Sequence, residues 1–232
     1  MITSQDTGKT GQMDVENRAK QSHGSSNNTI YEMVAKALGE KHTGGGVLVD
    51  VGCGAGNLYR FVNHQVDRYI GVDVVRYDGF PIDAEFIPHN FDIGKVPLAD
   101  ESADVVLSVE TIEHLENPRA FVRELVRLTK PGGLVIITTP NQLSLLSKLT
   151  LVLKNQFNAF QEAPGLYPAH ITALLEIDLI RIFTESGLTE IKVDFTNQGR
   201  LPFTPWSWPN KLGFRGRAFS DNILCLGLKP KG

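Results

Sequence analysis

The sequence predicts an α/β fold with a mostly parallel sheet of about seven strands, helices on both faces and an antiparallel last strand. The first observation is an apolar run, Val47–Val51, that contains a single acid and leads directly into a glycine-rich turn. A continuous apolar run bounded by glycine is typical of a central parallel strand that is covered on both faces. The second observation is that strand-like and helix-like apolar segments alternate along most of the chain, which favours a parallel α/β sheet.

The turn itself, Gly52-Cys53-Gly54-Ala55-Gly56, has glycine at every second position. Gly52 can adopt backbone conformations that are closed to other residues, and Gly54 allows a ligand to lie against the main chain. Gly56 allows residues 57–62 to begin a helix that packs tightly on the strand. The pattern predicts the nucleotide-binding turn of a Rossmann-like fold.

The spacing of the glycines indicates which nucleotide is bound. A dinucleotide fingerprint would have its third glycine at position 57, where this chain has Asn57. The pattern Gly-x-Gly-x-Gly, opened by Asp50, instead resembles the first motif of class I S-adenosylmethionine-dependent methyltransferases. The resemblance implies a Rossmann-like methyltransferase fold, with S-adenosylmethionine as cofactor and S-adenosylhomocysteine as product. It also implies that Asp50 lies under the methionine portion and binds its ammonium, directly or through water.

A second acid supports this interpretation. The stretch Tyr69–Asp73 is expected to form the second strand, and Asp73 lies 19 residues after Gly54. That is close to the separation of about 20 residues expected for the carboxylate that binds ribose hydroxyls in this fold. Together with the resemblance, these patterns predict the following cofactor-binding residues: Asp50, Gly52, Cys53, Gly54, Gly56, Asp73, Val74, Asp92, Ile93, Ser108, Val109 and Glu110.

Two of these regions follow later predicted strands. After the third strand, residues 85–89, the family often has an acid that binds the adenine amino group. Asp92 is the candidate here, with Phe91 or Ile93 against the ring, and a solvated loop acid is the alternative. The fourth strand, residues 105–109, is followed by residues 110–115, which are similar to the Glu-x-x-Glu-His-Leu passage of small-molecule methyltransferases, including those of quinone biosynthesis. Its side chains are expected to face both cofactor and acceptor.

Methyl transfer from this cofactor requires mainly that the acceptor atom be held in line with the bond that breaks. A neutral hydroxyl or an ammonium acceptor must also lose a proton, for which histidine is suited near neutral pH. His114 and His170 are the two candidates, and His114 is preferred for its place at the end of a strand. Glu110 and Glu113 could orient it or bind a cationic acceptor. Many such enzymes need no base, and the sequence predicts no metal site.

Two segments are expected to surround the acceptor. Residues 142–168 form an apolar, mainly helical insertion, which is predicted to be a lid over the acceptor pocket. A helix packed on the core and an amphipathic helix on a membrane surface are the alternatives. Residues 198–219 form a long loop that holds both tryptophans, four basic residues and no acid. It is interpreted as a contact for an anionic acceptor or an anionic membrane, or as a loop anchored by its aromatic side chains.

Composition limits the class of protein. The chain has 232 residues, a formal net charge of −3 and two cysteines that suggest reduced thiols. This balance does not favour nucleic-acid binding, and no apolar run reaches the length of a membrane span. We therefore expect a cytoplasmic protein without stable membrane insertion, with surface association left open. Residues 1–26 are predicted to be a flexible arm and residues 27–232 the methyltransferase domain.

The sequence therefore predicts a methyltransferase acting on an oxygen or nitrogen atom of a small, partly hydrophobic acceptor. Three other functions are the alternatives. A NAD-dependent oxidoreductase would need glycine at position 57 and a Tyr-x-x-x-Lys pair. A regulatory or non-catalytic partner subunit would keep the intact glycine loop but lose catalysis. A nucleic-acid methyltransferase would carry an Asn-Pro-Pro-Tyr-type or Pro-Cys motif, and neither occurs here.

Overall fold

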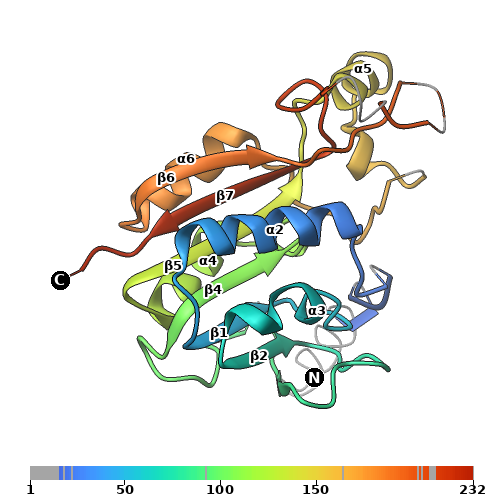
Figure 1. The fold of residues 1–232 in the computed structure, drawn as a ribbon. Coiled ribbons are helices and arrows are strands. Elements are labelled where there is room, and N and C mark those ends of the chain that lie inside the picture. Colours follow the sequence, from blue (N-terminus) through green and yellow to red (C-terminus); the bar gives the residue numbers. More distant parts are fainter. Residues whose placement is uncertain are drawn as a thin grey trace, which may run out of the picture.

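A computed structural model of the chain shows a seven-stranded sheet in the order β3-β2-β1-β4-β5-β7-β6. The structure describes residues 16–17, 19–21, 23–91, 93–163, 165–202, 204, 206–208 and 213–231. All neighbouring strands are parallel except where β7 pairs with β5 and with β6. The predicted sheet, including its antiparallel last strand, is confirmed (Figure 1).

The strands have the following bounds: β1 Val47–Val51, β2 Arg68–Asp73, β3 Glu85–Pro88, β4 Ala103–Val109, β5 Thr129–Pro140, β6 Thr189–Phe195 and β7 Asn222–Leu228. The α-helices are α2 Asn28–Lys41, α3 Tyr59–Val62, α4 Pro118–Leu128, α5 Leu145–Lys154 and α6 Glu176–Glu185. Short 3₁₀ helices are η1 Asn63–Gln65, η2 Ile112–His114 and η3 Asn158–Phe160.

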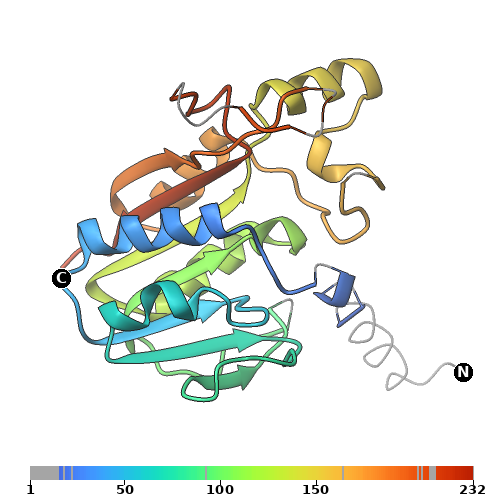
Figure 2. The ribbon, with the colours of Figure 1, turned by 45° about the vertical axis from the view of Figure 1, so that its right-hand side comes forward.

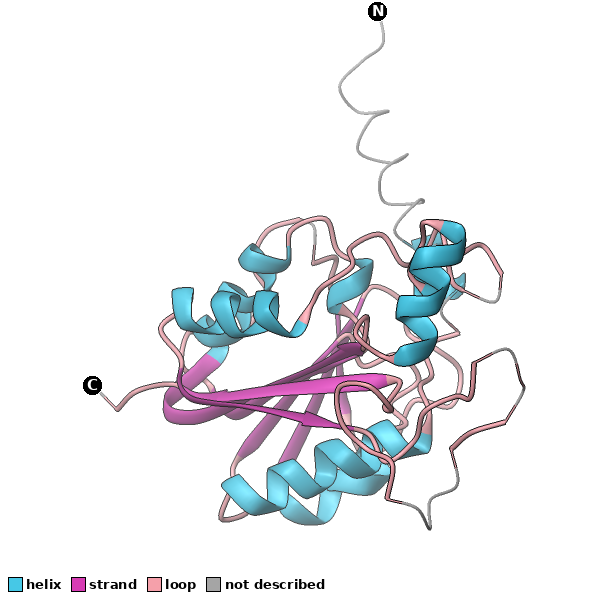
Figure 3. Cartoon of the chain, turned by 90° about the horizontal axis from the view of Figure 1, so that it is seen from above, coloured by secondary structure: helices cyan, strands magenta, loops and turns pink. Residues whose placement is uncertain are grey.

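Helices cover both faces of the sheet, so the molecule has three layers (Figure 3). On one face, α2 and the segment around α3 pack against β1, β4 and β5. Leu38, Leu48 and Val62 belong to this core. On the other face, α4 and α6 bury Leu125 and Phe183 against the same strands and β7. Successive residues of β1 therefore enter opposite cores, which explains its unbroken apolar character.

Three boundaries differ from what the local sequence favours. Lys130-Pro131-Gly132-Gly133 is typical of a turn before an apolar strand, yet it lies within β5, because this stretch exchanges main-chain hydrogen bonds with Lys229 after β7. The apolar spacing of residues 172–186 favours a helix over that whole stretch, but the helix begins only at Glu176, because the Ile171 and Thr172 amides donate to the Glu113 carbonyl instead. The helix expected at residues 57–62 begins two residues later, at Tyr59.

The topology brings several chain segments together at one edge of the sheet. β1 lies between β2 and β4, and the connections from these neighbours leave in opposite directions, which is the point where ligands bind in open α/β sheets. The glycine loop, Asp73 and Glu110 follow the carboxyl ends of these three strands. Segments from α5, from residues 155–170 and from the connection before β7 rise above the same edge (Figure 2).

We expect Phe183→Ala to lower the free energy of unfolding by about 3–5 kcal/mol, because it would leave a cavity in a fully buried core. Ile177→Ala is the matched control on the same helix, since Ile177 is 45% exposed, and it should cost less than about 1 kcal/mol. Urea denaturation followed by circular dichroism measures both. Equal losses for the two variants would show that α6 does not pack as described.

Candidate functional site

The glycine loop is fixed to the neighbouring strand β2. The amides of Gly52 and Cys53 both donate to the Val72 carbonyl, at 2.7 and 3.2 Å. Gly52, Gly54 and Gly56 have φ angles of +82°, +52° and +72°, in the left-handed region that favours glycine. The loop thus turns sharply at the end of β1 while its amides stay hydrogen-bonded.

Glycine is also required at these positions because a side chain would clash with neighbouring atoms. A Cβ atom on Gly52 would lie 2.2 Å from the Thr111 hydroxyl oxygen, and one on Gly54 would lie 2.3 Å from the Gly24 carbonyl oxygen. A Cβ atom on Gly56 would instead meet Pro81 and Phe80. The first two glycines therefore permit close approach at the ligand side, and the third permits packing beneath it.

Asp73 lies at the end of β2 and is buried. Its Oδ2 atom accepts a hydrogen bond from the Gly54 amide at 2.8 Å, and its Oδ1 atom accepts one from the Val75 amide at 3.3 Å. Burial raises the pKa of this carboxyl, and the two backbone hydrogen bonds oppose that shift. Each oxygen keeps a second lone pair, so the carboxylate can also accept hydrogen bonds from a ligand.

Asp50 is a buried acid in β1, the central strand of the parallel part of the sheet. Acids are rare at such buried positions. Its Oδ2 atom accepts a hydrogen bond from the Tyr69 hydroxyl, whereas its buried Oδ1 atom has no hydrogen-bond partner among the described residues. Burial raises the pKa of this carboxyl to about 7, although the Tyr69 hydrogen bond opposes the shift. A buried acceptor without a partner is costly, and a cationic ligand would offset that cost.

The segment just before α2 lies over the glycine loop. The Gly24 carbonyl accepts a hydrogen bond from the Ala55 amide at 2.8 Å. The Asn57 side chain donates to the Ser25 hydroxyl, and the Asn27 side chain donates to Gln198. We call residues 24–27 the N-terminal strap. Residues 1–15 of the predicted arm lie outside the described residues.

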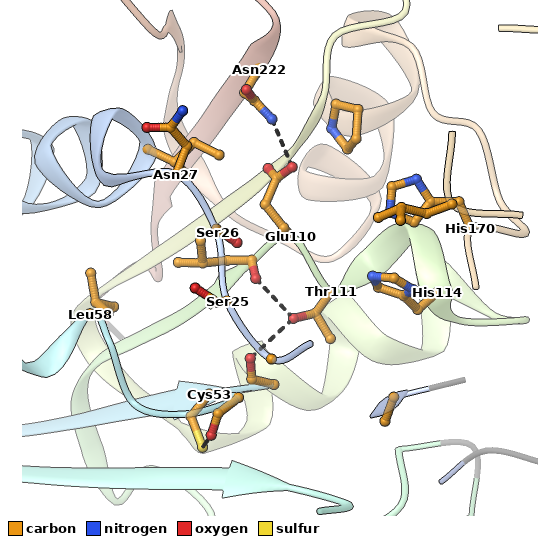
Figure 4. Close-up of a pocket in the computed structure, with 18 of the residues that line it drawn as sticks. Ser25, Ser26, Asn27, Cys53, Leu58, Glu110, Thr111, His114, His170 and Asn222 are labelled. Carbon is orange, nitrogen blue, oxygen red and sulfur yellow. Dashed lines mark hydrogen bonds between the residues drawn. The ribbon is translucent and has the colours of Figure 1, made fainter. Parts of the chain in front are cut away.

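These elements enclose a cavity of about 430 Å³, a size common for small-molecule sites. Its wall combines the strap, the ends of β1, β2 and β4, the lid segment and the connection before β7. Figure 4 shows Glu110 between the strap residues Ser26 and Asn27 and the two histidines, His114 and His170. The polar lining residues include Ser25, Asn27, Asp50, Asp73, Glu110, Thr111, His114, Asn158, His170, Gln198, Arg200, Asp221 and Asn222.

The cavity brings together most of the predicted cofactor-binding residues: Asp50, Gly52, Cys53, Gly54, Asp73, Val74, Val109 and Glu110. Three others do not line it. Gly56 packs beneath Phe80, Ser108 is fully buried within β4, and Ile93 is exposed to solvent. Phe91, the alternative to Ile93 for contact with the adenine ring, does line it. Asp92 lies outside the described residues.

Glu110 adopts an uncommon backbone conformation at the end of β4. Its φ angle is +51°, which is strained for a residue other than glycine, and it is held by hydrogen bonds from its amide to Thr138. Strain of this kind is characteristic of functional sites. Its Oε2 atom accepts a hydrogen bond from Asn222 at 2.7 Å. Burial raises the pKa of the Glu110 carboxyl to about 7.

Glu113, His114 and His170 form a compact group beside the cavity. One ring nitrogen from each histidine and one Glu113 oxygen lie within 4.8 Å of one another, a geometry that could hold a metal ion. His114 Nδ1 contacts the Ala169 carbonyl and His170 Nδ1 contacts the Ala159 carbonyl, both at 2.9 Å. A carbonyl only accepts, so Nδ1 carries the proton in each neutral ring.

The environments of these groups differ. Burial, followed by repulsion from His114, lowers the pKa of His170 to about 4, so this ring is neutral at physiological pH. Burial, followed by repulsion from Glu110, raises the pKa of the Glu113 carboxyl. The Thr139 hydroxyl donates to Glu113 Oε2 at 3.0 Å, and the Glu113 carbonyl anchors residues 171–172. Glu113 thus has a structural role in addition to its proximity to the histidines.

The donor set fits S-adenosylmethionine on two independent grounds. The orphaned Asp50 oxygen suits the cofactor's ammonium, and the buried carboxylate of Asp73 suits the hydroxyls of a ribose. A model of the methyltransferase domain family matches residues 28–193, which is more than half of the chain. The chain belongs to the S-adenosylmethionine-dependent methyltransferases.

Individual methyltransferases are also similar to this chain in sequence. A probable S-adenosylmethionine-dependent methyltransferase of Mycolicibacterium smegmatis is 30% identical over 171 residues, covering 69% of this chain and 64% of that protein. A ubiquinone biosynthesis O-methyltransferase of Maricaulis maris is 30% identical over 125 residues, covering 49% of this chain and 48% of that protein. The chain thus spans about half to two thirds of the length of these relatives.

Solved structures of methyltransferases share the fold. A S-adenosylmethionine-dependent methyltransferase from Archaeoglobus fulgidus aligns with a TM-score of 0.62 at 17% identity, covering 86% of this chain and 94% of that one. At this identity the likeness establishes the Rossmann-like methyltransferase fold and no more. Within the described part of the chain, no helix is long and apolar enough to cross a membrane.

Several lining residues of this methyltransferase were not predicted from the sequence. The strap residues Ser25 and Asn27, and Asp221 and Asn222 before or at the start of β7, reach the cavity. These four lie far in sequence from the glycine loop and carry no motif. Arg200 also lines the cavity, and it belongs to residues 198–219, the loop interpreted from the sequence as a candidate contact for an anionic acceptor. Thr111 could have been found, because it directly follows Glu110 in the predicted passage.

The shifted pKa of Asp50 predicts how stability changes with pH. Its pKa is about 7 in the folded protein and near 3.8 when unfolded, so between these values the folded state holds more protons and stability falls as pH rises. We expect Asp50→Asn to keep the contact with Tyr69 and to raise the free energy of unfolding of the unliganded protein at pH 8 by roughly 1–3 kcal/mol.

Urea denaturation at pH 5 and pH 8 measures this effect, with Asp78→Asn as the control at an exposed acid. Asp73, Glu110 and Glu113 also have raised pKa values and contribute to the pH dependence of stability. The contribution of Asp50 is therefore the difference in pH dependence between Asp50→Asn and the wild-type protein. An unchanged pH slope in Asp50→Asn would contradict the prediction.

Proposed function

We propose that the protein transfers a methyl group from S-adenosylmethionine to an oxygen or nitrogen atom of a small, partly hydrophobic molecule. The observation that carries this proposal is the position of two buried acids, Asp50 and Asp73, on one side of a single cavity. The other side is formed by residues that a cofactor of this family does not need, including Asn158, Leu166 and His170. The cavity therefore has one wall that suits the cofactor and a second wall that is left for an acceptor.

Cofactor binding is assigned to the side next to the glycine loop. Asp50 would pair with the ammonium, Asp73 would accept hydrogen bonds from the ribose hydroxyls, and Phe91 would contact the adenine ring. The strap residues Ser25 and Ser26 close this side of the cavity. When bound, the cofactor supplies a methyl group already activated by its sulfonium.

Acceptor binding is assigned to the side beneath the lid segment, residues 142–168. Described residues of this segment that line the cavity are Asn158, Ala159, Gly165 and Leu166, which supports the interpretation as a lid. Leu115 and Pro140 add apolar surface, which suits a partly hydrophobic acceptor. These residues would hold the acceptor atom in line for attack on the methyl carbon.

The positive charges of the long loop are already paired. Arg217 makes two hydrogen bonds to Glu176, Arg215 contacts Asp194, and Arg200 contacts Asp221 at 2.9 Å. Of these, only Arg200 and its partner line the cavity. The loop thus offers little unpaired charge to an anionic acceptor. Lys211, its fourth basic residue, lies outside the described residues.

The proton that leaves the acceptor is assigned to His114. His170 is the poorer candidate, because its pKa of about 4 gives it little affinity for a proton at neutral pH. His114 lies on the cavity wall, and its contact with the Ala169 carbonyl fixes the ring so that Nε2 carries the lone pair. His114 Nε2 would accept the proton that the acceptor loses when it is methylated.

The alternative activity is that of a regulatory or non-catalytic partner subunit that binds the cofactor without transferring its methyl group. A NAD-dependent oxidoreductase is less well supported, because Asn57 replaces the third glycine of the dinucleotide fingerprint. We place the protein in the cytoplasm, acting on a small molecule and not on nucleic acid, in line with its net charge of −3.

Calorimetric titration with S-adenosylhomocysteine should give micromolar binding, and NADH should give none. Asp73→Asn should weaken binding of the former at least about tenfold, since it removes a charged acceptor worth more than about 1.4 kcal/mol. Asp83→Asn is the control, because Asp83 is an exposed acid in the connection between β2 and β3. Failure of the wild-type protein to bind S-adenosylhomocysteine would remove the enzyme assignment.

Replacing the proposed base separates binding from catalysis. We expect His114→Asn to bind S-adenosylhomocysteine within about twofold of wild type and to lower kcat about 10²-fold or more. Methyl transfer from radiolabelled cofactor to a panel of phenols and amines measures kcat, and His64→Asn, an exposed histidine, is the control. If kcat is unchanged, the acceptor loses its proton elsewhere.

A further inference from the structure

Helix α5, Leu145–Lys154, has an inverted distribution of polar and apolar residues. Its buried residues are Ser147 and Thr150. Its exposed residues include Val152, 78% exposed, and Leu153, 64% exposed, together with Leu145, Leu149 and Leu151. A surface helix of a globular protein normally shows the opposite pattern, with its apolar stripe on the core.

The polar inner face is held by specific hydrogen bonds. The Ser147 hydroxyl donates to Gln142 at 3.2 Å and accepts from the Asn158 amide at 3.3 Å. The Thr150 hydroxyl donates to main-chain carbonyls of its own helix. The α5 N-terminus is tied to the long loop, since the Leu145 amide donates to the Ala218 carbonyl. Rotating the leucines inward would break the Ser147 bonds to Gln142 and Asn158, so these bonds hold the apolar face outward.

Other exposed apolar side chains belong to the same region. Leu166 and Tyr167 in the lid segment and Trp206 in the long loop are all more than one third exposed. Figures 1 and 2 both show α5 and the loop before β7 side by side above the edge of the sheet. Exposed apolar groups gathered in one region indicate an interaction surface.

The charges on α5 itself are also one-sided. No acid occurs in residues 142–161, and the first acid beyond them is the exposed Glu162. In the long loop the described arginines are paired with acids outside it, so among the described residues of this region the free positive charge lies on α5. Lys148 and Lys154 on α5 are exposed and make no ion pair within the part of the chain that the structure describes. Lys154 donates a hydrogen bond to the neutral Gln161 side chain at 2.8 Å, so both positive charges remain uncompensated by an acid. An apolar helix face flanked by such lysines complements an apolar surface that carries negative charge.

We propose that α5 docks the protein on the surface of an anionic lipid bilayer, with Leu149, Val152 and Leu153 in the acyl boundary and the lysines at the headgroups. The helix has ten residues, about 15 Å in length, so it can lie in the interface but cannot span it. Each lysine near such a surface adds an electrostatic attraction that salt screens.

A second copy of the chain fits this face less well. In a symmetric dimer the same patch meets itself, so the lysines of both copies would approach one another without an acid to pair with. A bilayer surface supplies both the apolar depth and the negative charge. Docking would place α5, the first helix of the lid segment, against the lipid.

Co-sedimentation with unilamellar vesicles tests this inference on the full chain and needs no methyl acceptor. We expect binding to vesicles of equal parts phosphatidylglycerol and phosphatidylcholine, weaker binding to phosphatidylcholine alone, and loss of binding in 0.5 M salt. The double variant Val152→Asp, Leu153→Asp should bind at least tenfold more weakly. Ile82→Asp, at an exposed position between β2 and β3 that is 94% exposed, should bind as wild type does.

Titration of each variant with S-adenosylhomocysteine shows that the fold is intact. Absence of wild-type binding to the anionic vesicles, or equal binding by the double variant, would overturn the inference. So would a dimer in light scattering that the double variant abolishes while vesicles bind neither protein, because the face would then join two copies. A catalytically inactive protein that still bound vesicles would leave this inference standing and remove only the proposed activity.

Discussion

The hydrogen bond from the Gly54 amide to Asp73 is the contact on which the site depends. It ties the loop after β1 to the end of β2 across 19 residues of sequence, and it fixes the conformation of a turn whose φ angles only glycine adopts freely. Without an acceptor at the end of β2, the Gly54 amide would be buried without a partner. The same carboxylate is the one proposed to bind ribose, so one group would both order the loop and bind the ligand.

The parts of the fold and site that follow from local sequence were predictable. The apolar run at Val47–Val51 and its glycines predicted the central strand and turn, and the spacing to Asp73 predicted the neighbouring acid. Glu110 was placed at the cavity by its position after β4, but its partner Asn222 lies 112 residues away and has no motif. Contacts of this kind depend on the pairing of β7 with β5, which no local pattern specifies.

Helix α5 shows a different limit of sequence reasoning. The leucine spacing indicated an amphipathic helix, but it could not show which face would be buried, because that choice depends on what lies beneath. Here the surface beneath is polar: the Gln142 side chain and the Asn158 amide both hydrogen-bond to the Ser147 hydroxyl. A lid and a membrane-surface helix are compatible interpretations, since residues 158–166 include lining residues of the cavity while the apolar face of α5 is exposed.

The N-terminal strap has a consequence for kinetics. Its residues form part of the cavity wall on the cofactor side, and the Gly24 carbonyl is bonded to the Ala55 amide of the glycine loop. If the cofactor binds as proposed, it would lie against these residues. Its exchange would then require main-chain motion only where a small number of hydrogen bonds hold the strap, which makes this segment the natural place for a conformational step in turnover.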